Sequence, residues 1–424
     1  MIFIYFGVYL ILGNFPRFIR ISGLPNNISI SELLLFSIII IYGLLNFKHY
    51  INLLKIKKIY FMFVAVILLF SVIGVIYHKG TAIQSFFYCI RLVAQLLSTF
   101  IIGEIFVIKF GRDFGKLINY ILGIFFIYTI IGWIMLFMFP QSDILWSFLS
   151  EFGIVFGGDP HIGRFYGSFF DPNFASSIMV FPFLLSLYMY LENSNKRYEY
   201  LILSLYFINC IIYSYSRSGI LGIAIGIFVV GLIHIFNIIR KKEKFNKKIF
   251  IFAIGFILLI VLILATNNEV IARLTGRFVG ISNDPSAQHR FDTMQIGAEH
   301  LTSDNSDVST LFSSPIYKIL MGIGYNYIKV DLKTQLTALD SSILNTLICF
   351  GAIGTILICI TFYGYLKKVF NNILKYNKSI GRYVFAYILA ALAICNFNDL
   401  LYYQFFIISF ISFLNYIFLL DTVE

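Results

Sequence analysis

Residues 218–266 read SGILGIAIGIFVVGLIHIFNI, IRKKEKFNKK and IFIFAIGFILLIVLILAT in succession. Two apolar runs, 218–238 and 249–266, therefore flank a short connection that carries six basic residues. An α-helix needs about twenty apolar residues to cross roughly 30 Å of hydrocarbon. The stretch predicts two membrane-spanning helices joined by a basic loop.

The same alternation extends over the whole chain. Of its 424 residues, 59% are hydrophobic and 12% are charged, which excludes a soluble globular domain. We expect one all-α, multi-pass transmembrane domain over residues 1–424. The apolar runs predict about twelve spans, near 2–13, 30–47, 59–77, 84–108, 115–139, 173–191, 199–214, 218–238, 249–266, 341–365, 381–398 and 402–420. The first run is as short as a signal-peptide core, but it lacks a basic segment before it and a cleavage site after it, so we interpret it as a span.

The basic residues predict the orientation of the spans. Twenty of the thirty-two Lys and Arg residues lie in one alternate set of connections, at 48–58, 109–116, 192–198, 239–248 and 366–382. Because cytoplasmic loops are enriched in Lys and Arg, we expect this set and both termini to be cytoplasmic. The same distribution argues against a nucleic-acid partner, despite the net charge of +11.

Two long polar segments, 140–172 and 267–340, fall on the outer side in this topology. The longer segment is the only long interval without an apolar run that could cross a bilayer, and we expect a short surface helix near 287–300 in it. A solvated connector helix is the alternative reading. Its arginines, which lie among carboxylates, are Arg273, Arg277 and Arg290. In a chain this hydrophobic, such a polar platform is where chemistry on a charged substrate is expected.

The segment 140–172 leads into a span through GRFYGSFFDPNFA, residues 163–175. Asp171-Pro172 is a helix-start signal, and Asn173 adds a second polar side chain at the outer membrane boundary. The N–H groups at a helix start suit an anion, and Arg164 could meet the same anion. An ordinary helix cap is the alternative interpretation.

A short outer hairpin, SYSRSG at 214–219, carries Arg217 at its tip. Arg217 could be a snorkelling topology residue, but its outward placement runs against the positive-inside trend and favours a functional role. With Arg164 and the arginines of the 267–340 segment, it would form a guanidinium cluster suited to phosphate or pyrophosphate. Arg91, with Gln95 one turn later, lies inside a span and must face protein or a polar cavity, so structural pairing and a substrate role both fit.

In this order the motifs resemble the O-antigen ligase and Wzy-type polymerase superfamily, over roughly residues 160–355. The resemblance rests on Arg-x-x-Gly and Asp-Pro-Asn-x-Ala before a span, Ser-Arg-Ser-Gly between spans, a long outer loop with Arg290, and Gly322-Ile-Gly324 before the next span. Members resemble the GT-C class of polytopic glycosyltransferases and use glycans linked to undecaprenyl pyrophosphate. The resemblance implies that the outer arginines bind the lipid pyrophosphate.

The resemblance also distinguishes two activities. Ligases, which move the finished glycan to lipid A–core, typically have a histidine before a Ser/Tyr-rich span start, where this chain has Asp340. That departure favours a polymerase of O-antigen or capsule. Asp340 would then be the general base. The alternative is that Asp340 is only the N-cap of the tenth span. The expected catalytic residues are Asp340, Arg290 and Arg217, and the expected pyrophosphate- and glycan-binding residues are Arg164, Asp171, Asn173, Arg273 and Arg277.

No metal or other cofactor is expected. Metal-dependent GT-C enzymes usually resemble one another in an acidic pair in the first outer loop, and residues 14–29 contain no Asp or Glu. The five cysteines all lie in apolar runs, which supports neither disulfides nor a thiolate metal site.

The expected location is the bacterial inner (cytoplasmic) membrane. The expected partners are undecaprenyl-pyrophosphate-linked oligosaccharides, the bilayer and, by resemblance, a chain-length regulator. A lipid-linked oligosaccharide flippase is the rival from another class. A flippase should have related halves and arginines within its spans, so the asymmetric outer loop favours an enzyme.

Overall fold

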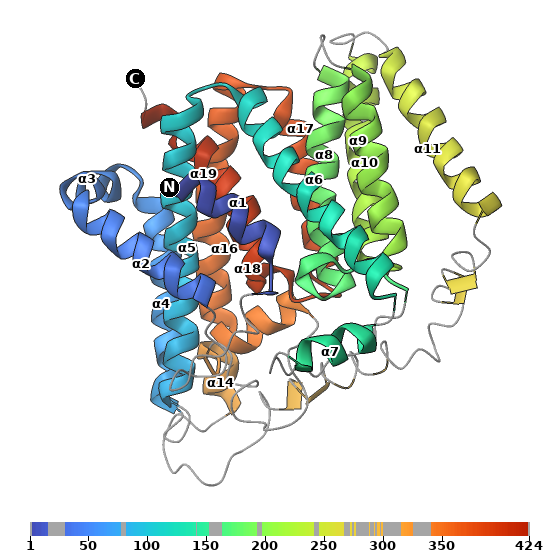
Figure 1. The fold of residues 1–424 in the computed structure, drawn as a ribbon. Helices are drawn as coiled ribbons and strands as arrows, with labels where there is room; N and C mark the ends of the chain where they lie inside the picture. The colour runs from blue at the N-terminus through green and yellow to red at the C-terminus, as the bar shows by residue number, and fades with distance from the viewer. Residues whose placement is uncertain are drawn as a thin grey trace. The chain divides into compact units, whose positions relative to one another are not determined.

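The computed structural model describes residues 2–15, 30–77, 82–140, 142–151, 163–192, 197–240, 246–266, 315–324 and 341–422, with separate positions between 272 and 299. Within these residues all regular structure is helical, as predicted (Figure 1). The chain divides into two compact units that are interleaved in sequence. Unit 1 comprises Met1–Leu34, Phe106–Ile281 and Ile373–Ile394, and unit 2 comprises Leu35–Ile105, Ser282–Asn372 and Cys395–Glu424.

The chain has several helices of the membrane-spanning type. In the described part, six are long and apolar enough to cross a bilayer, or seven if the bent pair Leu33–Leu45 and Phe47–Ile56 is one span. The six are Phe87–Phe110, Phe114–Met138, Pro172–Glu192, Arg217–Ile239, Ser342–Tyr376 and Gln404–Thr422. Each interval predicted from the sequence lies on a helix or on a run of short helices. The figure of twelve spans stays a prediction.

In unit 1 the central helix is α8 (Pro172–Glu192), whose side chains from Ala175 to Leu191 are all buried. The helices packed around it are α6 (Phe114–Met138), α9 (Arg197–Tyr213), α10 (Arg217–Ile239) and α17 (Ile380–Ile394). A mainly apolar helix is stable when neighbouring helices cover it, and the burial of the α8 side chains shows that they do; α9 and α10 lie beside α8 in Figure 1. Glycine allows the close approach of α10, because a Cβ at Gly222 would lie 2.9 Å from the Val180 side chain.

The remaining elements of unit 1 extend this bundle. The helix α1 (Ile2–Leu12) packs on α6, where Tyr120 donates a hydrogen bond of 2.6 Å to the Phe3 carbonyl. The helix α11 (Lys247–Thr266) packs on α8 and α9. Between α6 and α8 the chain forms α7 (Ser142–Glu151) and the short η2 (Gly167–Phe169).

The basic connections of unit 1 meet at one end of its bundle. The Arg112 guanidinium lies 4.8 Å from the Tyr376 ring centroid, and Arg382 pairs with Glu192 at 3.7 Å. Lys248 donates to the Leu191 carbonyl at 3.0 Å. The described residues of these connections, which are Arg112, Glu192, Lys248, Tyr376 and Arg382, therefore share one end, as one membrane side requires. That this side is the cytoplasm stays a prediction.

Unit 2 is built around a C-terminal run of buried turns. This run consists of α18 (Gln404–Phe406), the π-helical η6 (Ile407–Ile411) and α19 (Ser412–Leu419). Asn415 in α19 accepts a hydrogen bond of 2.9 Å from Tyr365 and donates one of 3.0 Å to Thr99. These bonds tie the run to α16 (Ser342–Tyr376) and α5 (Ala82–Phe110). Buried side-chain hydrogen bonds of this kind join helices that have only hydrocarbon around them.

The remaining elements of unit 2 are α3 (Phe47–Ile56), α4 (Lys58–Tyr77), α14 (Pro315–Met321), η5 (Leu400–Tyr402), η7 (Leu420–Thr422) and the part of α2 (Ile30–Leu45) from Leu35 onward. The buried Lys57, between α3 and α4, binds the Phe418 carbonyl at 3.0 Å and pairs with Asp421. The chain's C-terminal turn is thereby fastened to the start of α4.

The long helix α16 is broken at Gly351, which has φ 63° and ψ −178°. The break deprives preceding carbonyls of helical partners. Ile323 N–H donates to the Ile348 carbonyl at 3.0 Å, and Gly324 N–H donates to the Cys349 carbonyl at 2.9 Å. The Gly-x-Gly motif, which follows α14 (Pro315–Met321), thus supplies backbone donors to the broken helix.

The packing of α5 against α19 gives a testable prediction. A Cβ at Gly103 would lie 2.6 Å from Asn415 Cβ and 2.8 Å from the Tyr416 amide nitrogen, so Gly103→Ala must push α19 away. We expect a loss of about 1–3 kcal/mol in stability. Gly123→Ala is the matched control, because no atom lies within 4 Å of its Cβ position. The measurement is the thermal unfolding midpoint of the two purified proteins in detergent, which should be lower for Gly103→Ala. Equal midpoints would show that this contact is not tight.

Candidate functional site

Five of the residues singled out in the sequence gather at one end of unit 1, around the turn that joins α9 to α10. The turn consists of Ser214, Tyr215 and Ser216, and Tyr215 adopts a left-handed conformation with φ 50°. Ser216 is the N-cap of α10 and accepts a hydrogen bond from the Gly219 N–H. The tight turn holds the end of α9 and the start of α10 in fixed relation.

Arg164 is anchored directly on this turn. Its side chain is buried, with Nε donating to the Ser214 carbonyl at 2.9 Å and Nη2 donating to Asn173 Oδ1 at 3.3 Å. The neighbouring Phe165 N–H donates to the Tyr213 carbonyl at 2.9 Å. Part of the guanidinium therefore serves structure, by satisfying a carbonyl at the C-terminal end of α9.

Asp171 begins α8, as the sequence predicted. Its Oδ1 accepts hydrogen bonds from the Asn173 N–H at 2.7 Å and the Phe174 N–H at 3.2 Å. The capping interpretation of this aspartate is therefore confirmed. Asn173 presents its side chain to Arg164, so the two polar residues that flank Pro172 have different partners.

The starts of α8 and α10 lie side by side. Ser177 on α8 donates to the Asn173 carbonyl at 2.6 Å, and its hydroxyl lies 3.5 Å from the Ser218 hydroxyl on α10. Ser218 is in turn 2.9 Å from the Ser216 hydroxyl. Two helix N-termini therefore face the same end of the unit, each carrying the equivalent of about half a positive charge.

Two further guanidinium groups lie at this end. Arg273 lies over the Tyr215 ring at 5.6 Å from the centroid, and a Cβ at Gly163 would lie 2.8 Å from its Nη1. Gly163 has φ 61°, a conformation that suits glycine. Arg217 is half-buried as the first residue of α10, directly after the capping serine.

Cationic side chains predominate at this end among the described residues. It combines the guanidinium groups of Arg164, Arg217 and Arg273 and the N-termini of α8 and α10 with the Asp171 carboxylate and the C-terminal end of α9. Tyr166 follows Arg164 by two residues. Burial raises the pKa of Tyr166 to about 12, so its phenol stays neutral. Such a set can bind an anion with several oxygen acceptors through planar, charge-assisted hydrogen bonds.

Three predicted site residues, Arg277, Arg290 and Asp340, lie outside the described residues. Described positions within the expected helix 287–300 are helical, and Gln295 donates to Glu299 at 2.9 Å across one turn. Only the helix is supported there, and the roles of the three residues stay predictions.

The residues directly after Asp340 are fixed in unit 2. Ser341 Oγ accepts a hydrogen bond from the Leu344 N–H at 3.3 Å, so Ser341 is the residue that caps α16. Ser342 N–H donates to the Cys395 carbonyl at 2.8 Å, and its hydroxyl donates to the Asn398 carbonyl at 3.0 Å. The capping role that Asp340 could have had is therefore taken by its neighbour.

Sequence reasoning missed Asp399, which lies beside this segment. Asn345 on α16 donates to Asp399 Oδ1 at 3.2 Å, and Thr346 on α16 lies within 2.7 Å of the Tyr402 hydroxyl. The available signal was the polar triplet Asn396, Asn398 and Asp399 between two apolar runs.

The sequence left open whether Arg91 has a structural partner or a substrate role. In unit 2, Arg91 donates to Gln404 Oε1 at 3.1 Å. Structural pairing is therefore supported. A substrate role for Arg91 stays untested.

In the described part of the chain, no group of three or more His, Cys, Asp or Glu side chains is placed to share a metal ion. Metal-independent chemistry stays an expectation. Comparison of the chain with protein-family models, with curated proteins and with solved structures finds no match. A function must therefore be argued from the site itself.

Proposed function

We propose that this protein is a polysaccharide polymerase of the outer face of the bacterial inner membrane. It transfers a growing glycan from undecaprenyl pyrophosphate onto a new lipid-linked repeat unit, for O-antigen or capsule. The proposal includes a GT-C-like domain of about twelve spans, with both termini cytoplasmic. The ligase reaction, with lipid A–core as acceptor, is the nearest alternative.

The gathering of Arg164, Arg217 and Arg273 with two helix N-termini at one end of unit 1 is the observation that carries the proposal. The ligand that this geometry fits is a di-anion or poly-anion with many oxygen acceptors at the membrane surface. Pyrophosphate carries such a charge and offers many oxygen acceptors. Its polyprenyl chain would hold it at the membrane surface.

The transfer itself requires two things of the protein. The bond from the anomeric carbon to the pyrophosphate oxygen breaks, and a bond from the same carbon to an acceptor hydroxyl oxygen forms. The pyrophosphate leaves with the bonding electron pair, and the guanidinium groups stabilise the charge that develops on it. The acceptor proton moves to a carboxylate, a step that typically contributes a rate factor of roughly 10²–10⁴.

Asp340 is the proposed general base, and Arg290 and Arg277 are proposed as further pyrophosphate ligands. Two described features support a carboxylate role here. Ser341 already caps α16, which removes the main structural reason for an acidic residue at the preceding position. Asp399 is the second carboxylate near the start of this helix, and its bond to Asn345 fits a role in orienting the acceptor sugar.

The function is tested first by deleting the gene in its host and separating the glycolipids by size. Loss of a polymerase leaves one repeat unit on its lipid, whereas loss of a ligase or a flippase leaves none. We expect the single-repeat product. The absence of any glycan would contradict the proposal.

Arg217→Lys tests the guanidinium cluster in that deletion strain. Lysine keeps the charge but cannot make the bidentate contact, so we expect glycan chain formation to fall by roughly tenfold or more at normal protein levels. Arg240→Lys is the matched control, since Arg240 lies over the Phe236 ring at the other end of α10. A normal ladder of chain lengths from both variants would show that guanidinium geometry does not matter.

Asp340→Asn and Ser341→Ala separate chemistry from capping. Asparagine cannot accept a proton at neutral pH, so Asp340→Asn should accumulate normally and leave single repeats. Ser341→Ala removes the observed cap and should lower stability by about 1 kcal/mol while chains still form. A full ladder from Asp340→Asn would remove Asp340 from the mechanism. The checks are the glycan ladder and the thermal midpoint of each variant.

A further inference from the structure

Unit 1 contains a pocket of about 480 Å³ at the end where its basic connections meet. The starts of α11 and α17 line it together with the ends of α8 and α10. Its polar lining residues are Glu192, His234, Asn246, Lys247, Ser379 and Arg382. The guanidinium cluster is at the opposite end of α8 and α10, so the pocket belongs to a different site.

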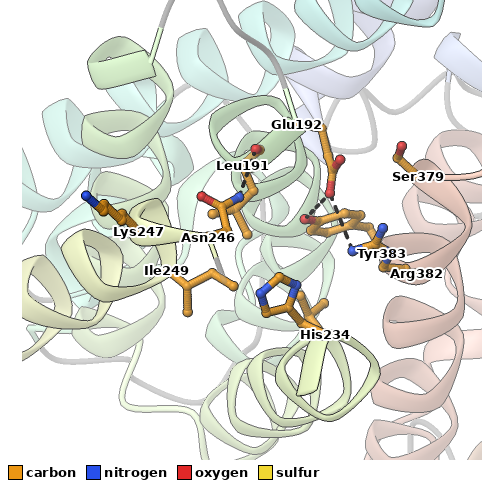
Figure 2. A pocket seen from close by; sticks show the side chains of 10 residues that line it. Leu191, Glu192, His234, Asn246, Lys247, Ile249, Ser379, Arg382 and Tyr383 are labelled. Atoms are coloured by element: carbon orange, nitrogen blue, oxygen red, sulfur yellow. Dashed lines mark hydrogen bonds and ion pairs between the residues drawn. The ribbon is translucent and has the colours of Figure 1, made fainter. Parts of the chain in front are cut away.

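The polar groups of the pocket are already organised. Figure 2 shows the Glu192 carboxylate in contact with both Arg382 and Tyr383, at 3.7 Å and 3.5 Å, with His234 and Asn246 nearby and Lys247 extending outward. The Arg382 side chain is only 18% exposed. The contact with Glu192 holds the Arg382 guanidinium in the wall of the pocket.

The charge balance of the pocket favours an anionic ligand. Among the lining residues other than His234, Arg382 and Lys247 are cationic and Glu192 is anionic, which leaves one excess positive charge. A phosphodiester carries one negative charge and offers oxygen acceptors to a guanidinium, an amide and a hydroxyl. Phosphate chemistry therefore matches both the charge and the donor set.

The surroundings of the pocket favour an amphipathic molecule. Val230 and Ile249 contribute apolar lining, and exposed apolar side chains continue along both helices. On α10 they include Ile235 and Ile239, and on α11 they include Phe250 and Ile254. A headgroup in the pocket would therefore have apolar surface beside it for acyl chains.

We infer that this pocket binds a phosphate ester, in the form of a lipid headgroup or of a small soluble phosphate. The inference is independent of the proposed glycan transfer, because it uses other residues at the other end of the unit. Arg382 supplies the principal contact, and Glu192 limits its strength by competing for the same guanidinium.

The test is native mass spectrometry of the delipidated full-length protein in detergent. The probes are phosphatidylglycerol, diacylglycerol with the same acyl chains, and glycerol 3-phosphate as a competitor. We expect one molecule of phosphatidylglycerol to bind more tightly than any further phosphatidylglycerol molecules. Diacylglycerol should not occupy this site. If glycerol 3-phosphate displaces the lipid, or binds alone, the source is a soluble ester, and if it does neither, the source is the lipid.

Three variants place the binding in the pocket. Arg382→Gln should weaken phosphate binding about tenfold, the equivalent of one charge-assisted contact. Glu192→Gln should strengthen phosphate binding several-fold, because the competing carboxylate is gone. A purely structural defect would weaken binding instead. Lys116→Gln is the matched control, since Lys116 is a basic residue of the 109–116 connection that pairs with Asp113 and does not line the pocket.

Several results would overturn the inference. They are no phosphate binding, equal binding of diacylglycerol, or Arg382→Gln and Lys116→Gln having equal effects. If Arg382→Gln does not fold, Glu192→Gln decides alone, and weaker or unchanged binding in that variant refutes the site.

Discussion

Backbone groups in hydrocarbon have no water to bind, and this constraint accounts for several polar contacts in the described part of the chain. Each carbonyl or N–H that a helix leaves without a partner at its end needs one from the protein. At the end of α9, Arg164 binds the Ser214 carbonyl; at the break in α16, Ile323 and Gly324 donate to exposed carbonyls. Several polar contacts of the protein therefore lie where helices end or break.

The same constraint gives Arg164 a structural role beside the anion-binding role that we propose for it. The Nε of Arg164 is committed to a backbone carbonyl, which fixes the plane of the guanidinium and orients its remaining N–H groups. A preorganised donor set loses little entropy on binding an anion. Arg217 and Arg273 are held differently, by a helix start and by an aromatic ring, so the cluster depends on the turn between α9 and α10.

Local signals in the sequence were sufficient for the helices and for part of the site. Asp171-Pro172 identified the start of α8, whereas the contact of Arg164 with Asn173 was not among the predictions. The contact of Arg273 with Tyr215 and the bond of Asn345 to Asp399 join residues more than fifty positions apart, and no periodicity encodes such pairings. The break at Gly351 was also hidden, because a glycine within an apolar run is equally typical of close helix packing.

The central claim is tested most directly with the purified protein in liposomes, supplied with a synthetic undecaprenyl-pyrophosphate-linked repeat unit. The account predicts glycans of increasing length, with one undecaprenyl pyrophosphate released for each bond formed. Transfer of intact repeat units across the bilayer without chain growth would contradict it.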